Sequence, residues 1–149
     1  MNINFKQVAI SSIVFLIISQ IINSITAVFT MSYYTNREYF ALWSKVMMPA
    51  NGPPGTEFFL ASIIIDLIVG MILAGSYSLL ADAIPGEGIS KGINYGILLF
   101  LIAGVPFTLT VFLLFAVPGS LLVFWAISSL VIYLISGAVF AKIMVEKAK

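Results

Sequence analysis

The chain has 149 residues, of which 61% are hydrophobic and only 9% are Asp, Glu, Lys or Arg, and its formal net charge is +1. Soluble globular domains carry about 25% charged residues, so this composition excludes an ordinary soluble domain, and the near-zero charge leaves no basic face for nucleic acid. The chain contains neither Cys nor His, which excludes disulfides, thiolate zinc sites, axial-His haem and a Ser/His/Asp triad, so we expect a membrane protein without metal or cofactor.

Four apolar runs are long enough for helices that cross a bilayer, which takes roughly 20 residues each. The second run contains one charge, Asp66, and the last two are joined at Pro118-Gly119, where proline stops a helix and glycine permits a tight turn. The runs do not alternate as the strands of a β-barrel would. We therefore expect a single all-α domain, 1–149, that forms a four-transmembrane-helix bundle. The expected spans are 8–31, 58–81, 92–117 and 120–141.

The first run has an alternative interpretation as a cleaved signal peptide, because Lys6 precedes it and small residues occur near Ser24 and Ala27. The run is longer than a typical signal core, and Ile25 occupies a position near the candidate cleavage site where a small residue is expected. A retained span is therefore favoured.

The distribution of basic residues predicts the orientation, because short translocated loops are depleted of Lys and Arg. Arg37 and Lys45 fall between the first two spans, and the other five bases fall on the opposite side. We therefore expect the chain to lie in the plasma membrane with both termini in the cytoplasm. The stretch 32–57 is expected on the outer side. The five cytoplasmic bases are Lys6, Lys91, Lys142, Lys147 and Lys149.

The outer stretch between the first two spans has apolar residues at helical spacing. This pattern predicts a short amphipathic helix that begins near Thr35 or Asn36, ends before Pro49 and lies at the membrane surface, where aromatic rings settle at headgroup depth. We interpret it as an interfacial anchor, with a lid or docking surface for a partner as the alternative. Its apolar residues are Tyr39, Phe40, Trp43, Val46 and Met47.

Small and polar residues recur at four-residue intervals along the second span. Such a ridge lets helix backbones approach closely in lipid, so it is expected to be a helix-packing surface, and Gly137 in the fourth span is a further packing candidate. The ridge consists of Ser62, Asp66, Gly70, Ala74, Ser78 and Asp82. In the third span Pro106 removes a backbone donor to the carbonyl of Ile102 and predicts a bend.

Asp66 lies about nine residues inside the outer end of its span, or roughly 13 Å at the helical rise. An acid at that depth is costly in lipid and normally faces the protein interior. The other three spans place uncharged polar residues at the same depth, which predicts a polar layer around Asp66 in the outer half of the bundle. These residues are Gln20, Asn23, Thr108, Ser128 and Ser129.

Two functions remain open on this pattern. The first is a non-catalytic structural or accessory subunit of a membrane assembly, bound to copies of itself or to other membrane subunits, in which Asp66 is a structural hydrogen-bond centre. The second is a small proton- or cation-coupled transporter or channel, in which Asp66 binds the ion and the polar layer lines its site. An enzyme is disfavoured because acid–base chemistry usually recruits several ionisable groups, whereas one acid lies deep in the membrane.

Overall fold

The computed structural model describes residues 4–50 and 52–144, and within these residues every regular element is a helix. Residues Lys147 and Lys149, which contribute to the expected orientation, lie outside this part of the chain. The elements in chain order are α1 (Phe5–Thr35), the 3-10 helix η1 (Arg37–Leu42), α2 (Thr56–Leu80), the 3-10 helix η2 (Ala81–Ala83), α3 (Gly88–Leu99), the π-helix η3 (Phe100–Gly104), α4 (Val105–Leu114) and α5 (Gly119–Ile143).

Four of the helical segments are long and apolar enough to cross a membrane, which confirms the expected all-helical class and the number of such helices. The first is longer at both ends than its apolar run, because polar residues can continue a helix. The side chain of Asn4 caps its start by accepting the amides of Lys6 and Gln7 at 3.2 and 3.3 Å. Hydropathy therefore locates the apolar part of this helix and misses its polar ends. The four segments are 5–35, 56–83, 88–114 and 119–143.

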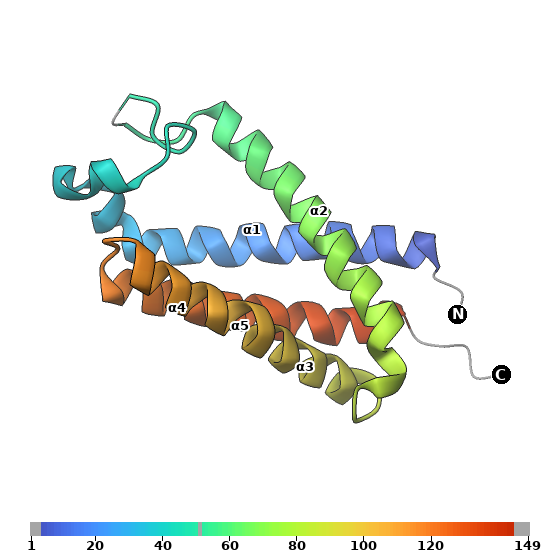
Figure 1. Cartoon of the computed structure of the whole chain (residues 1–149). Helices are drawn as coiled ribbons and strands as arrows, with labels where there is room; N and C mark the ends of the chain where they lie inside the picture. The colour runs from blue at the N-terminus through green and yellow to red at the C-terminus, as the bar shows by residue number, and fades with distance from the viewer. Residues whose placement is uncertain (1–3, 51, 145–149) are drawn as a thin grey trace.

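The helices form an open arrangement (Figure 1). α1, α5 and the continuous α3–η3–α4 helix lie side by side, whereas α2 crosses α1 and its first half projects away from α4 and α5. We call the end with the start of α1, the α2–α3 connection and the end of α5 the terminal end. The opposite end, with residues 36–50, 52–55 and 115–118, is the loop end.

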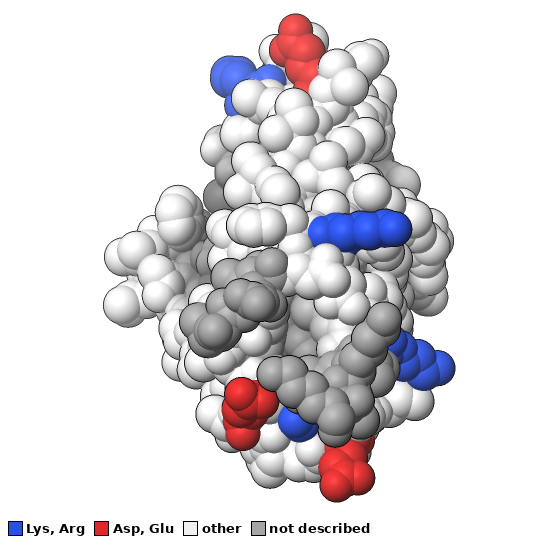
Figure 2. All heavy atoms as spheres, turned by 90° about the vertical axis from the view of Figure 1, so that its right-hand side faces the viewer, with Lys and Arg blue, Asp and Glu red and all other residues white. Residues whose placement is uncertain are grey.

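Charged side chains lie towards the two ends of the molecule, with Asp66 as the exception within the apolar helices. Seen from the terminal end, side chains of both signs are separated by uncharged surface (Figure 2). The charged residues described at this end are Lys6, Asp82, Glu87, Lys91 and Lys142.

The closest helix contact joins α3 and α5 in the terminal half. A Cβ added at Gly92 would overlap the backbone carbonyl of Gly137, and a Cβ added at Gly137 would overlap that of Gly92. At Gly96 a Cβ would lie 2.5 Å from the carbonyl oxygen of Tyr133. The two backbones are therefore in direct contact, as small residues permit in membrane helices.

The hydrophobic core lies beside this contact and is centred on Tyr95, which is fully buried. Its ring packs edge-on against Tyr77 with centroids 5.1 Å apart, and its hydroxyl donates to the carbonyl oxygen of Leu73 at 2.7 Å. Phe15 of α1 and Phe140 of α5 complete the same cluster. The core thus joins all four long helical segments near the terminal end.

The third helical segment changes its winding before the proline. Residues Phe100–Gly104 form a π-helix in which the amide of Val105 donates to the carbonyl oxygen of Phe100, five residues earlier. The ring of Phe100 occupies the space where a Cβ of Gly104 would lie. Pro106 therefore follows a π-helical turn, and α4 beyond it contains no buried residue.

The predicted amphipathic helix at the loop end is wrong in its extent. The observed 3-10 helix ends at Leu42, and residues 43–50 form turns. The hydroxyl of Ser44 accepts the amide of Met47 at 3.2 Å, and its carbonyl accepts the amide of Met48 at 2.9 Å. A serine that bonds nearby amides competes with regular helix, and Pro49 disfavours helical geometry at the residue before it.

Candidate functional site

The polar residues of α1 and α2 meet in one hydrogen-bonded cluster around Asp66. The hydroxyl of Ser19 donates to Oδ1 of Asp66 at 3.1 Å, and Nε2 of Gln20 donates to Oδ2 at 2.8 Å. The same amide nitrogen lies 3.3 Å from the hydroxyl of Ser62, and Nδ2 of Asn23 donates to Ser19 at 3.1 Å. We call these five residues the Asp66 cluster. Each carboxylate oxygen of Asp66 is therefore engaged by a neutral side chain of α1.

Helical periodicity explains why these side chains meet. Ser19 and Asn23 are four residues apart on α1, and Ser62 and Asp66 are four apart on α2, so each pair lies on one face. Gln20 adjoins the first pair and reaches across to the second. Ser19 is only 3% exposed, which places the centre of the cluster in the seam between the helices.

The predicted ridge continues this seam towards the terminal end. A Cβ at Gly70 would lie 2.9 Å from the Cα of Ser12, so only a glycine permits this approach of α1 and α2. The hydroxyl of Ser12 donates to the carbonyl oxygen of Leu67 at 2.7 Å, and Ala74 is fully buried in the core. Ser78 is half-buried and Asp82 is exposed, so the ridge leaves the close contact before its end.

The other residues expected at the depth of Asp66 make separate contacts. Ser128 of α5 shares a hydrogen bond of 2.5 Å with Thr26 of α1. Thr108 donates to the carbonyl oxygen of Gly104 in its own helical segment at 2.8 Å, and Ser129 is half-buried and joins neither contact. Within the described residues, the structure thus unites Gln20 and Asn23 with Asp66 and leaves the α4 and α5 hydroxyls apart from it.

An aromatic cluster lies at the loop end and includes residues that the sequence interpretation did not single out. The indole nitrogen of Trp43 donates to the carbonyl oxygen of Tyr33 at 3.3 Å, and its ring centroid lies 4.8 Å from that of Tyr34 and 6.3 Å from that of Trp125. Tyr33 also bonds Ser120 at the start of α5 at 2.6 Å. The sequence signal that could have predicted this contact is the presence of aromatic residues at the ends of two apolar runs that meet on the same side.

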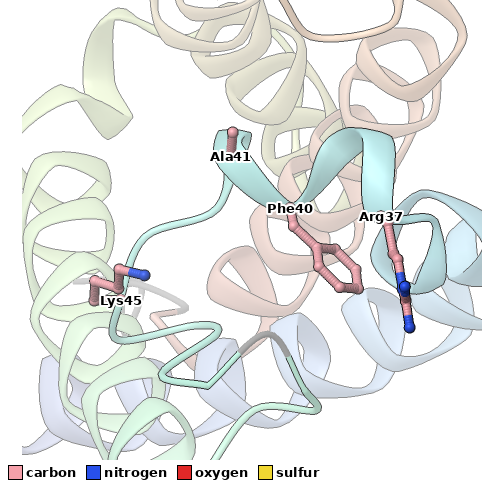
Figure 3. A pocket seen from close by; sticks show the side chains of 4 residues that line it. All are labelled: Arg37, Phe40, Ala41 and Lys45. Carbon is pink, nitrogen blue, oxygen red and sulfur yellow. The ribbon is translucent and has the colours of Figure 1, made fainter.

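The remaining predicted interfacial residues have different environments. Tyr39 packs against Tyr33 with ring centroids 5.7 Å apart, whereas Val46 is 52% exposed. Phe40 lines a hollow at the loop end together with Arg37, Ala41 and Lys45 (Figure 3). Met48, which was not predicted as an anchor, is only 3% exposed.

A second hollow lies near the terminal end, between α3 and α5, and its lining is apolar except for Lys142. Neither this hollow nor the one at the loop end is lined by a residue of the Asp66 cluster. In the described part of the chain, no group of three or more His, Cys, Asp or Glu side chains could hold a metal ion. Comparison with protein-family models, curated proteins and solved structures found no match to the chain.

Proposed function

We propose that the chain is a non-catalytic subunit of a membrane assembly, with four transmembrane helices and a helix face that binds another membrane chain. The observation that carries this proposal is the hydrogen bonding of Asp66, whose two carboxylate oxygens each accept a hydrogen bond from a side chain of α1, Ser19 or Gln20. A polar group that is satisfied between two helices fixes how they pack. This arrangement supports a structural role for the acid.

A face of α2 supports the association with another chain. A Cβ added at Gly75 would meet nothing within 4 Å, in contrast to Gly70 on the opposite side of the helix. The neighbouring positions along the same face are large apolar side chains that are 44–63% exposed, and α2 meets α5 only marginally. A glycine between apolar side chains suits close packing of a further helix. These side chains are Ile64, Ile68, Ile72 and Leu79.

The proposed orientation places the terminal end in the cytoplasm and the loop end outside the plasma membrane. The described part of the terminal end carries three lysines, Lys6, Lys91 and Lys142, against two bases at the loop end, Arg37 and Lys45. Lys147 and Lys149 add to this difference in the sequence. The excess of basic residues at one end supports this orientation by the positive-inside rule.

The association is tested with a photoreactive amino acid introduced at position 75 in cells that express the chain. We expect irradiation to yield a crosslinked product from position 75, with twice the subunit mass for a homo-oligomer or a larger distinct mass for another membrane subunit. The matched control is the same amino acid at Val123, which is 57% exposed on α5 and outside the proposed face. Equal products from both positions, or none from position 75, would contradict the proposal.

The second candidate is a proton- or cation-coupled transporter or channel that uses Asp66. One observation favours it: Asp66 is only partly buried, so the protein does not fully enclose its carboxylate. Proton and monovalent-cation flux is measured in liposomes with the wild-type chain and Asp66→Asn, with helix content and particle size checked for both. The subunit proposal predicts no flux from either chain.

The two outcomes of the flux experiment separate the candidates. Flux in the wild type that disappears in a folded Asp66→Asn variant would make Asp66 an ion-binding residue and favour the transporter. Gln20→Ala serves as the comparison, because it removes a partner of Asp66 and retains the carboxylate. A transporter that requires the acid itself would retain more flux in Gln20→Ala than in Asp66→Asn.

A further inference from the structure

The hollow at the loop end has a basic side chain on each side of an aromatic ring (Figure 3). Its volume is about 620 Å³, and it is lined by Arg37, Phe40, Ala41 and Lys45. Arg37 and Lys45 flank Phe40 from opposite sides, and the lining includes no acidic residue. The hollow therefore combines two positive charges with the aromatic ring of Phe40.

The segment that carries these bases is held in place by other residues. Asn36 accepts the amide of Glu38 at 3.1 Å and caps the 3-10 helix that begins at Arg37. Beyond that helix, Trp43 is bonded to Tyr33, and Ser44 fixes the turn that contains Lys45. In the described chain neither base takes part in these bonds. Both guanidinium and ammonium groups are thus left to bind a ligand.

The position of the hollow indicates the depth of that ligand in a bilayer. Two of its lining residues, Ala41 and Lys45, flank Trp43 in the sequence, and the ring of Trp43 packs against Tyr34 of α1. Aromatic rings at the ends of membrane helices settle at the headgroup level. The hollow therefore lies where the phosphates of a leaflet meet the ends of the apolar helices. Arg and Lys bind phosphate strongly, and basic residues near a bilayer surface attract anionic lipids.

We propose that this hollow binds the headgroup of an anionic phospholipid in the adjoining leaflet. Arg37 and Lys45 attract the anionic headgroup from the two sides of Phe40, and the ring of Phe40 contacts the glycerol and the first part of an acyl chain. This contact of the ring favours a lipid over a free anion, which has no apolar part. This proposal requires the chain to lie in a bilayer and is independent of the proposed subunit role.

The test uses Trp43, which follows the hollow in the sequence, as a local fluorescent probe. The chain has two tryptophans, so Trp125→Phe leaves Trp43 as the single one. Its fluorescence is measured in vesicles of phosphatidylcholine with increasing fractions of brominated phosphatidylglycerol, and with brominated phosphatidylcholine for comparison. We expect the anionic lipid to quench Trp43 more strongly at equal mole fraction, because it accumulates at the hollow.

Charge variants show whether the two bases cause this preference. The double variant Arg37→Gln/Lys45→Gln is expected to reduce the preference for the anionic lipid, by about fivefold for each base removed. The variant Arg37→Lys/Lys45→Arg is expected to retain it. Lys6→Gln/Lys91→Gln removes equal charge from the terminal end and is expected to leave the quenching of Trp43 unchanged.

Three results would overturn the proposal. The first is equal quenching by the anionic and the zwitterionic lipid in the folded chain. The second is a preference that survives Arg37→Gln/Lys45→Gln. The third is loss of the preference in millimolar inorganic phosphate but not in sodium chloride of equal ionic strength, which would identify a site for a free anion.

Discussion

The two carboxylate oxygens of Asp66 have different partners, a hydroxyl on one side and an amide on the other. Ser19 and Gln20 both donate to them, so the cluster needs an acceptor at this position more than it needs a negative charge. An asparagine retains one acceptor oxygen for Gln20 and gains an amide that can donate to Ser19. An alanine provides neither group.

We therefore predict that Asp66→Ala lowers the free energy of unfolding by about 1–2 kcal/mol, because polar groups of two helices lose their partners. Asp66→Asn is expected to stay within about 0.5 kcal/mol of the wild type, since interhelical hydrogen bonds are remade. The measurement is unfolding in mixed micelles by titration with a denaturing detergent, followed by circular dichroism. Equal losses in the two variants would show that the cluster depends on the charge.

Glycines in this chain differ in what surrounds them, which gives a second prediction. Gly92→Ala is expected to destabilise the fold by about 3 kcal/mol or more, because its methyl group would overlap the backbone of Gly137. Gly75→Ala, with open space at its Cβ, is expected to stabilise the isolated chain by about 0.5–1 kcal/mol through higher helix propensity. Thermal unfolding in the same detergent measures both, and similar effects would contradict the contact between α3 and α5.

For the candidate site, the sequence could predict only how deep each side chain lies along its helix. Counting residues along each span gives the depth of a side chain, and Gln20 and Asn23 do share a cluster with Asp66. The rotation of each helix and the choice of neighbour are not fixed by counting. Thr108 and Ser128 therefore satisfy their hydroxyls elsewhere, although the sequence placed them at the same depth.

Among the elements, the segment between α1 and α2 departs most from its sequence pattern. Apolar residues at helical spacing predicted one amphipathic helix, and the structure instead has a 3-10 helix, turns and a buried Met48. Of the residues in this pattern, Tyr39 and Trp43 pack against tyrosines of α1, whereas Val46 is exposed. Hydrogen bonds from the amides of Met47 and Met48 to Ser44 favour a turn over a continued helix. Hydrophobic periodicity does not include such local bonds.

Trp43 is the side chain that ties this segment to both α1 and α5. We predict that Trp43→Ala accelerates amide hydrogen exchange in residues 37–48 by about tenfold or more, because it removes a large, half-buried ring and a hydrogen bond. Exchange in α3 and the second half of α5 is expected to stay unchanged. Trp43→Phe, which keeps a ring, should give an intermediate effect, and acceleration throughout the chain would indicate general unfolding instead.

The whole molecule is less closed than a four-helix bundle predicted from four apolar runs. α2 contacts α1 along the Asp66 cluster and the ridge, while its other face is left exposed. The sequence could not show this, because lipid-facing and helix-facing surfaces of such a chain are equally apolar. The small and polar residues of α1 and α2 indicate which of their faces meet, whereas apolar residues alone do not distinguish a face that contacts a helix from one that contacts lipid.

The orientation of the whole chain can be measured with single cysteines, since the natural sequence contains none. Ala50→Cys lies in the exposed loop-end segment and Glu87→Cys lies in the exposed connection at the terminal end. We predict that a membrane-impermeant thiol reagent labels position 50 in intact cells, and position 87 only after the membrane is opened. Labelling of position 87 in intact cells would reverse the proposed orientation.

The change of winding at Phe100–Gly104 has a mechanical consequence for the third helical segment. α3 is fixed by backbone contact with α5, whereas α4 beyond Pro106 buries no residue. Tilting α4 therefore disturbs few side chains, while the glycine contact at the other end is kept. If the chain spans a bilayer as we propose, we expect a change in bilayer thickness to alter the tilt of α4 more than the arrangement of the other helices.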